Sequence, residues 1–168
     1  LESLAAYEEN HRPIIYLDES GFKSHDYRLY GYSPKGEQCG GHHNWQLKNI
    51  TNAIGAIYQQ QLFAVGLYDC SINCDVFHDW VENILIPELP CESVIVMDNA
   101  TFHKRQKTQE LIKNAGHSIL YLPPYSPHFN LIEQTWAWIK QKRKEWRLDW
   151  IDSLFFYFMW ICDSFKVL

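Results

Sequence analysis

Two apolar segments of this chain each run directly into an aspartate, and those aspartates are the first residues that can do chemistry. Ile14–Leu17 leads into Asp18, and Val94–Met97 leads into Asp98. Short apolar runs rich in β-branched residues are typical of buried strands. One strand that ends on an acid says little, because every strand must end on something. Two such strands raise the question of whether the two carboxylates meet.

If the two strands are parallel neighbours, both carboxylates lie at the same edge of a sheet, which is where open α/β sheets bind ligands. Two carboxylates at short range repel each other unless a proton or a cation lies between them. Mg²⁺ suits such a place, because it is held by one or two carboxylates together with water and phosphate oxygens. The same repulsion predicts that Asp98→Asn leaves the metal-free fold as stable as before, or more stable.

A third carboxylate, that of Glu133, lies in the first turn of a predicted long helix. The prolines between 123 and 127 stiffen the entry to this helix, so that Glu133 can be aimed at the strand ends. The same residue has a structural alternative. Asn130 is a favourable N-cap residue, and a glutamate three residues later completes a capping box. The spacing is compatible with both roles.

The hydrophobic periodicity and the turn residues predict a definite order of elements. Strands are expected over residues 13–18, 49–58, 62–68, 93–97 and 118–122, and helices over residues 75–85, 104–115 and 131–146. The first three strands should be antiparallel, whereas the strands separated by helices should be parallel. This order predicts an α/β protein with a mixed five-stranded sheet flanked by helices, the ribonuclease H-like fold.

The composition is that of one such domain. The chain has 168 residues, of which 46% are hydrophobic and 15% aromatic, and this excludes an intrinsically disordered chain. Its five cysteines form no CxxC pair, and their odd number favours reduced thiols and a cytosolic or nuclear setting. No apolar segment approaches the roughly 20 residues that a membrane span needs, so no membrane association is predicted.

The formal net charge of −5 argues mildly against a large nucleic-acid contact surface. The cations nevertheless gather near the candidate carboxylates, at Lys104 and Arg105 and on the long helix at Lys140, Lys142, Arg143 and Lys144. Lysine and arginine supply the sequence-independent part of DNA binding by contacting phosphates. Cations at the end of a helix also complement its dipole, which is the structural alternative for the second group.

Four blocks of the sequence carry a family resemblance. They are YLDESGF (16–22), SPKG (33–36), VIVMDNATFHK (94–104) and LPPYSPHFNLIEQTWAWIKQK (122–142). Together, and in this order, they resemble the catalytic domain of DDE transposases, most closely the bacterial insertion-sequence branch of the mariner-like superfamily. The 34 residues between Asp98 and Glu133 (99–132) match the spacing in that superfamily. The family usually has an acidic residue in place of His128 and a proline in place of Leu131, so the loop geometry is expected to differ here.

The resemblance implies a site and its cofactors. Asp18, Asp98 and Glu133 would form the catalytic triad and bind two divalent cations, Mg²⁺ or Mn²⁺, per active site. Asn99 and His103 would then either lie behind the triad and orient a phosphate or a water, or only begin the next helix.

The reaction implied by the resemblance is DNA strand cleavage at transposon ends, followed by strand transfer into target DNA, with TA dinucleotides as targets. A homodimer is expected in the active complex, with a helix-turn-helix DNA-reading domain upstream or on a companion chain, in the bacterial cytoplasm with the nucleoid. Residues 1–12 are expected to be a tether or the end of a preceding helix. Residues 13–148 would be the ribonuclease H-like DDE catalytic domain, and residues 149–168 a C-terminal packing helix.

Two alternatives remain open on the sequence. A structure-directed nuclease of the same fold is disfavoured by the 79 residues between Asp18 and Asp98 (19–97) and by the PPYSP block. A truncated or domesticated transposase that serves only as a DNA-binding or assembly module is disfavoured by the presence of all three carboxylates. Metal-dependent nicking of element-end DNA distinguishes these alternatives from the transposase.

Overall fold

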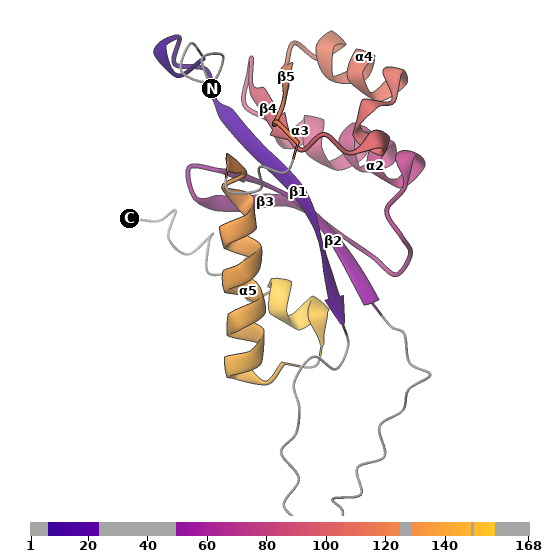
Figure 1. Ribbon diagram of the computed structural model, residues 1–168, viewed down its shortest axis with the longest axis vertical. Helices are drawn as coiled ribbons and strands as arrows, with labels where there is room; N and C mark the ends of the chain where they lie inside the picture. Colours follow the sequence, from indigo (N-terminus) through magenta and orange to yellow (C-terminus); the bar gives the residue numbers. More distant parts are fainter. Residues whose placement is uncertain (1–6, 24–49, 125–128, 149, 157–168) are drawn as a thin grey trace, which may run out of the picture.

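The computed structural model of the protein describes residues 7–23, 50–124, 129–148 and 150–156 (Figure 1). In chain order the elements are β1 (Ile14–Lys23), β2 (Ile50–Tyr58), β3 (Gln61–Tyr68), α2 (Cys74–Trp80), the π-helical turn η1 (Val81–Leu85), α3 (Ile86–Glu88), β4 (Val94–Met97), the 3-10 helix η2 (Thr101–Lys104), α4 (Gln106–Asn114), β5 (Ser118–Tyr121) and α5 (Ile132–Trp146). The SPKG block and His128 lie outside the described residues.

The five strands form one mixed sheet in the order β3-β2-β1-β4-β5. β1 pairs antiparallel with β2, and β2 with β3, whereas β4 is parallel to both β1 and β5. Gln59 and Gln60 join β2 to β3 with φ angles of 46° and 66°, and two positive φ angles are what a tight hairpin turn needs to match the twist of its strands. The predicted mixed five-stranded sheet is therefore confirmed.

Helices cover both faces of the sheet (Figure 1). The side chains of β1 alternate between these faces, as they do along any strand. On one face, Leu17 is fully buried in a core shared with Trp80 of α2. On the other face, Phe22 meets Trp136 of α5 edge-on, with 6.2 Å between ring centroids. Even-numbered residues of β1 therefore face α5, and odd-numbered residues face α2 and its neighbours.

Two element boundaries differ from the sequence prediction. The helix predicted over 75–85 does not end at Leu85, because the helical run continues from α2 through η1 and α3 to Glu88 and includes Pro87. β1 does not end at Asp18 but continues to Lys23, because it stays paired with β2 as far as Ile50. Asp18 therefore lies in the middle of β1, beside the point where its other neighbour, β4, ends.

The last described segment packs against α5. Residues 151–156 are helical, and Ile151, Leu154 and Phe155 are buried in the same core as Trp136. The rest of the helix predicted over 149–168 lies outside the described residues. Within the described part of the chain, no helix is long and apolar enough to cross a membrane.

Candidate active site

The pairing of β1 with β4 places the two predicted aspartates at equivalent positions. The last parallel pair joins Tyr16 to Val96, and Asp18 and Asp98 each follow two residues later. Neighbouring strands are about 4.8 Å apart, and residues in register point to the same face. Because β4 ends at Met97, the chain leaves the sheet at Asp98, directly beside Asp18.

Glu133 is brought to this edge by a contact between α5 and β1. The side-chain amide of Asn130 is buried and donates a hydrogen bond to the Leu17 carbonyl oxygen at 3.0 Å. The backbone N–H of Glu133 in turn donates to the Asn130 carbonyl oxygen at 3.1 Å. The first turn of α5 is therefore attached to the residue that precedes Asp18.

This contact also rules out the capping-box alternative for Glu133. The N-cap of α5 is Leu131, and the helix start has no side-chain cap. A cap would need the Asn130 side-chain oxygen to accept a helix N–H, but this oxygen accepts no hydrogen bond, while the amide nitrogen donates to β1. Glu133 is exposed on the first turn. Its side chain is therefore not engaged in capping the helix.

Asp18 experiences the negative charge of the site most strongly. Burial, followed by the negative charges of Glu19, Glu133 and Asp98 in this order, raises the pKa of its carboxyl from 3.8 to about 8. A buried carboxyl among other carboxyls takes up a proton unless a cation is present. The metal-free site therefore keeps Asp18 neutral at pH 7.

Asp98 has the opposite environment. Its Oδ1 lies 2.8 Å from Nδ1 of His103 and accepts a hydrogen bond from the backbone N–H of Ala100 at 2.9 Å. The hydrogen bond from His103 is the main cause that lowers the pKa of the Asp98 carboxyl. The like-charge repulsion expected at Asp98 is therefore located at Asp18 instead, which corrects the expected effect of Asp98→Asn on the metal-free fold.

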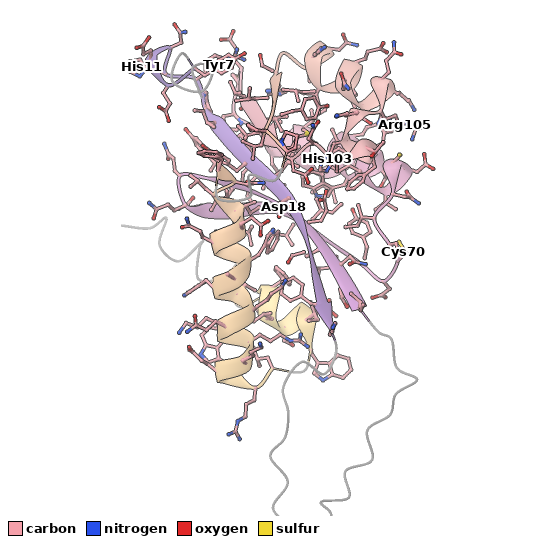
Figure 2. The ribbon with its side chains drawn as sticks, in the orientation of Figure 1. Tyr7, His11, Asp18, Cys70, His103 and Arg105 are labelled. Carbon is pink, nitrogen blue, oxygen red and sulfur yellow. The ribbon has the colours of Figure 1, made fainter. Side chains whose placement is uncertain are left out.

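His103 connects Asp98 to a carboxylate that the sequence argument passed over. Its Nε2 lies 2.8 Å from Oε1 of Glu19, and the residue is 1% exposed. Its ring centroid is 4.5 Å from that of Phe77 and 4.3 Å from that of Phe102. Burial alone would lower the pKa of His103, but the hydrogen bonds to Asp98 and Glu19 raise it to about 9. In Figure 2, Asp18 lies on β1 and His103 lies toward the helices on one side of that strand.

Strand alternation places Glu19 on the face of β1 opposite to Asp18. On that face it meets η2, which is why it contacts His103. Nothing in the sequence showed that His103, five residues after Asp98, turns back to contact both strands. Asn99 is exposed, so of the two residues predicted to lie behind the triad, it is His103 that contacts Asp98.

The carboxylates of this site offer oxygen atoms that could bind a divalent cation. Among the described residues, no three His, Cys, Asp or Glu side chains lie close enough together to hold a metal ion as they stand. The chemistry of the donors nevertheless fits an oxygen-preferring cation, because Asp18 is a buried carboxyl among negative charges that a cation would offset. Both hydrogen bonds of Asp98 use Oδ1 and neither uses Oδ2, and 54% of the Asp98 side chain is exposed.

Comparison with known proteins decides the family. The family model described as DDE superfamily endonuclease matches residues 13–154, which include all three predicted carboxylates. The chain belongs to this family. No curated protein sequence matches the chain. The predicted resemblance to DDE enzymes is confirmed, and the bacterial insertion-sequence branch stays a prediction.

Solved structures of Mos1 transposase share the fold of this DDE domain. A pre-cleavage Mos1 transpososome gives a TM-score of 0.70 at 17% identity, over 99% of this chain and 53% of that one. The catalytic domain of Mos1 mariner transposase gives 0.65 at 16% identity, over 99% of this chain and 77% of that one. The predicted ribonuclease H-like fold is therefore confirmed. The DDE domain spans about half of the chain found in the transpososome.

One of the predicted DNA contacts of the DDE domain needs correction. Arg143 is 4% exposed, and its guanidinium donates hydrogen bonds to the carbonyl oxygens of Leu148, at 3.1 Å, and Lys23, at 2.6 Å. It holds the end of α5 against the end of β1. Because its donors are buried and satisfied by the protein, Arg143 is not a phosphate ligand.

The other cations predicted to contact DNA differ in whether their charged groups already contact side chains of the protein. Arg105 forms an ion pair with Asp75, and Lys142 forms one with Glu145 at 2.6 Å. The ammonium group of Lys140 lies over the Phe22 ring, 5.4 Å from its centroid. Lys104, whose ammonium lies over the Tyr121 ring, and Lys144 are exposed. These two lysines are best placed to meet a phosphate.

Proposed function

We propose that this domain is the catalytic domain of a DDE transposase, which cleaves DNA strands at the ends of a mobile element and joins them to target DNA. One observation carries the proposal. Asp18 and Asp98 hold equivalent positions on adjacent parallel strands, and the Asn130–Leu17 hydrogen bond brings the first turn of α5, with Glu133, to the same place. Membership of the DDE superfamily endonuclease family supports this assignment.

In the proposed site, Asp18, Asp98 and Glu133 hold divalent cations, Mg²⁺ or Mn²⁺. Solved Mos1 structures include a paired end complex with Mn and a catalytic domain with Mg, and these support the choice for this chain. When bound, such cations supply Lewis-acid activation of a water or a DNA 3′-hydroxyl and charge stabilisation at phosphorus. Asp18 contributes an anion that the metal-free fold keeps protonated, so cation binding at neutral pH releases its proton.

The DNA is held by residues outside the triad. Two exposed lysines, Lys104 in η2 and Lys144 in the last turn of α5, provide sequence-independent phosphate contacts. The two ions per site, the TA target, the homodimer and a helix-turn-helix reading domain belong to the same proposal. The family supports them, and solved Mos1 structures of a transpososome and of a paired-end complex with a transposon end support DNA as the partner.

The proposal is tested by nicking of a supercoiled plasmid that carries the element's own ends, with Mg²⁺ or Mn²⁺ and with EDTA. We expect cation-dependent nicking that falls by at least about 100-fold in Asp18→Asn, Asp98→Asn and Glu133→Gln, since even residues behind metal ligands are worth 10–100-fold. Asp69→Asn is the matched control, because Asp69 also follows a strand, β3, and is exposed.

A non-catalytic module would give a different result. It would bind the plasmid without nicking it under any of these conditions, and the three substitutions would leave binding unchanged. Nicking that survives all three substitutions would assign the activity to other residues. Either result would overturn the proposed function.

A further inference from the structure

We propose that Glu19 and His103 are positioning residues that set the orientation of the Asp98 carboxylate from the opposite face of the sheet. This inference rests on the proposed function, because it takes Asp98 as a cation ligand. It adds two residues to the site that touch neither the cation nor DNA and that act through Asp98.

The geometry of the imidazole carries the inference. Its Nδ1 lies 2.8 Å from Oδ1 of Asp98, and its Nε2 lies 2.8 Å from Oε1 of Glu19. Both nitrogens face carboxylate oxygens, so the ring cannot turn over without losing a hydrogen bond. The rings of Phe77 and Phe102 both pack against the imidazole, and His103 is 1% exposed, so close packing restricts the movement of its ring.

A purely structural role explains this arrangement less well. The Asp98 side chain is 54% exposed, so water and the Ala100 N–H could satisfy its oxygens without His103. Placing the imidazole there instead requires burying a polar ring completely, which is unfavourable unless each of its nitrogens is paired. The hydrogen bond from His103 holds the Asp98 carboxylate in one orientation, which water molecules alone would not do. Fixed ligand orientation is what residues behind metal ligands provide.

Glu19 extends the effect to Asp18. The two residues are adjacent on β1 and point to opposite faces of the sheet. Glu19 therefore connects the backbone of one proposed ligand, through His103, to the side chain of the other. The two contacts of His103, with Glu19 and with Asp98, fix the Asp98 carboxylate relative to β1. They do so beyond the end of β4, where β1 and β4 are no longer paired.

Two substitutions of His103 separate its two hydrogen bonds. His103→Asn places an amide N–H where Nδ1 was, so it can still donate to Asp98 but is too short to reach Glu19. His103→Gln places its amide near Nε2, so it keeps the contact with Glu19 and loses the one with Asp98. Tyr121→Phe is the local control, because the Tyr121 hydroxyl donates to the His103 backbone oxygen at 3.1 Å and does not touch the ring nitrogens.

The first readout is the affinity for Mn²⁺, measured by calorimetry on the full chain, with melting temperatures as a check on folding. We expect His103→Gln to weaken Mn²⁺ binding by about 10- to 100-fold, while His103→Asn recovers most of the loss and Tyr121→Phe binds as wild type. If the Asn and Gln variants lose affinity equally, or neither loses any, the proposal is overturned.

The second readout needs no metal and separates this proposal from the proposed function. In crystal structures of the metal-free variants, the Asp98 carboxylate should keep its direction in His103→Asn and turn away in His103→Gln. Should His103→Gln fail to fold, Glu19→Ala and Glu19→Gln make the same comparison, because only Gln retains an acceptor for Nε2. If wild type binds no Mn²⁺, the proposed function fails, and the Asp98 orientation alone then decides whether Glu19 and His103 position it. An unchanged Asp98 direction in every variant would refute the positioning role.

Discussion

The side-chain amide of Asn130 donates to the backbone carbonyl of Leu17, 113 positions earlier in the chain, at 3.0 Å in a buried setting. One side chain thereby joins the start of α5 to β1 immediately before Asp18. The position of Glu133 relative to the sheet depends on this bond, because Glu133 lies on the helical turn that Asn130 begins. The geometry of the proposed triad is thus maintained by a residue outside it.

Asn130→Ala should affect both stability and activity. It leaves the buried Leu17 carbonyl without its partner, for which we expect a loss of about 1–3 kcal/mol in the free energy of unfolding, measured in urea. Nicking should fall further than the stability loss explains, because Glu133 is no longer held. Asn83→Ala is the control, since the Asn83 amide makes exposed contacts with Asp79 on its own helix. Equal effects of the two substitutions would contradict the claim that Asn130 holds Glu133 in position.

Asp18→Asn and Asp98→Asn should change the stability of the metal-free protein in opposite directions. Asp18→Asn removes a buried carboxyl from among negative charges and should raise the melting temperature at pH 8–9, where that carboxyl ionises. Asp98→Asn weakens a charge-assisted hydrogen bond with His103, and we expect a loss of roughly 1 kcal/mol, as for a lost cap. Melting curves in EDTA measure both. A higher melting temperature for Asp98→Asn would show that repulsion, and not the bond to His103, dominates at Asp98.

The stability of the metal-free protein should fall as the pH rises from about 4 to 9. The pKa of Asp18 is raised from 3.8 to about 8, so between these values the folded state binds more protons than the unfolded state, and stability decreases with pH. The pKa of His103 is raised from 6.5 to about 9, so its contribution is complete below 6.5 and is lost as the pH passes 9. Urea unfolding across this range, in EDTA, measures the slope. Asp18→Asn should flatten it between pH 4 and 6.5, and a slope unchanged by that substitution would contradict the assigned pKa.

The structure changes which cations should matter for DNA binding. Lys104→Gln and Lys144→Gln should each reduce the slope of log K against log salt by roughly 0.9 if each lysine neutralises one phosphate. Lys113→Gln, on the exposed side of α4, is the matched control. Arg143→Gln should instead lower the melting temperature, because it leaves the carbonyls of Lys23 and Leu148 unpaired. Filter-binding titrations at several salt concentrations, together with melting curves, separate the two effects.

The sequence was sufficient for the fold, and it nominated three carboxylates whose shared role as a cation site stays a prediction. The apolar runs before Asp18 and Asp98 marked two strands, and the order of elements determined that they are parallel neighbours. The sequence did not reveal that β1 continues past Asp18, because the residues that follow, Glu19 to Lys23, are kept in a strand by pairing with β2 and not by their own propensity.

The role of Asn130 could not be decided from the sequence for a related reason. Its type and spacing satisfy a local rule, the capping box, but in the structure its amide donates to a distant residue. Arg143 looked like one cation among several on a basic helix, and only the packing of α5 on β1 shows that it is buried. In both cases the deciding interaction is long-range, and local sequence patterns carry no information about it.

The most direct test of the account is where Mn²⁺ binds. Crystals of the wild-type protein soaked in Mn²⁺ should give an anomalous difference peak at the end of β4, with carboxylate oxygens of Asp18, Asp98 and Glu133 as its nearest protein atoms. The same soak of Asp18→Asn crystals should give no peak there. A peak bound elsewhere, or no peak at this edge of the sheet at saturating Mn²⁺, would contradict the claim that these three residues form one cation site.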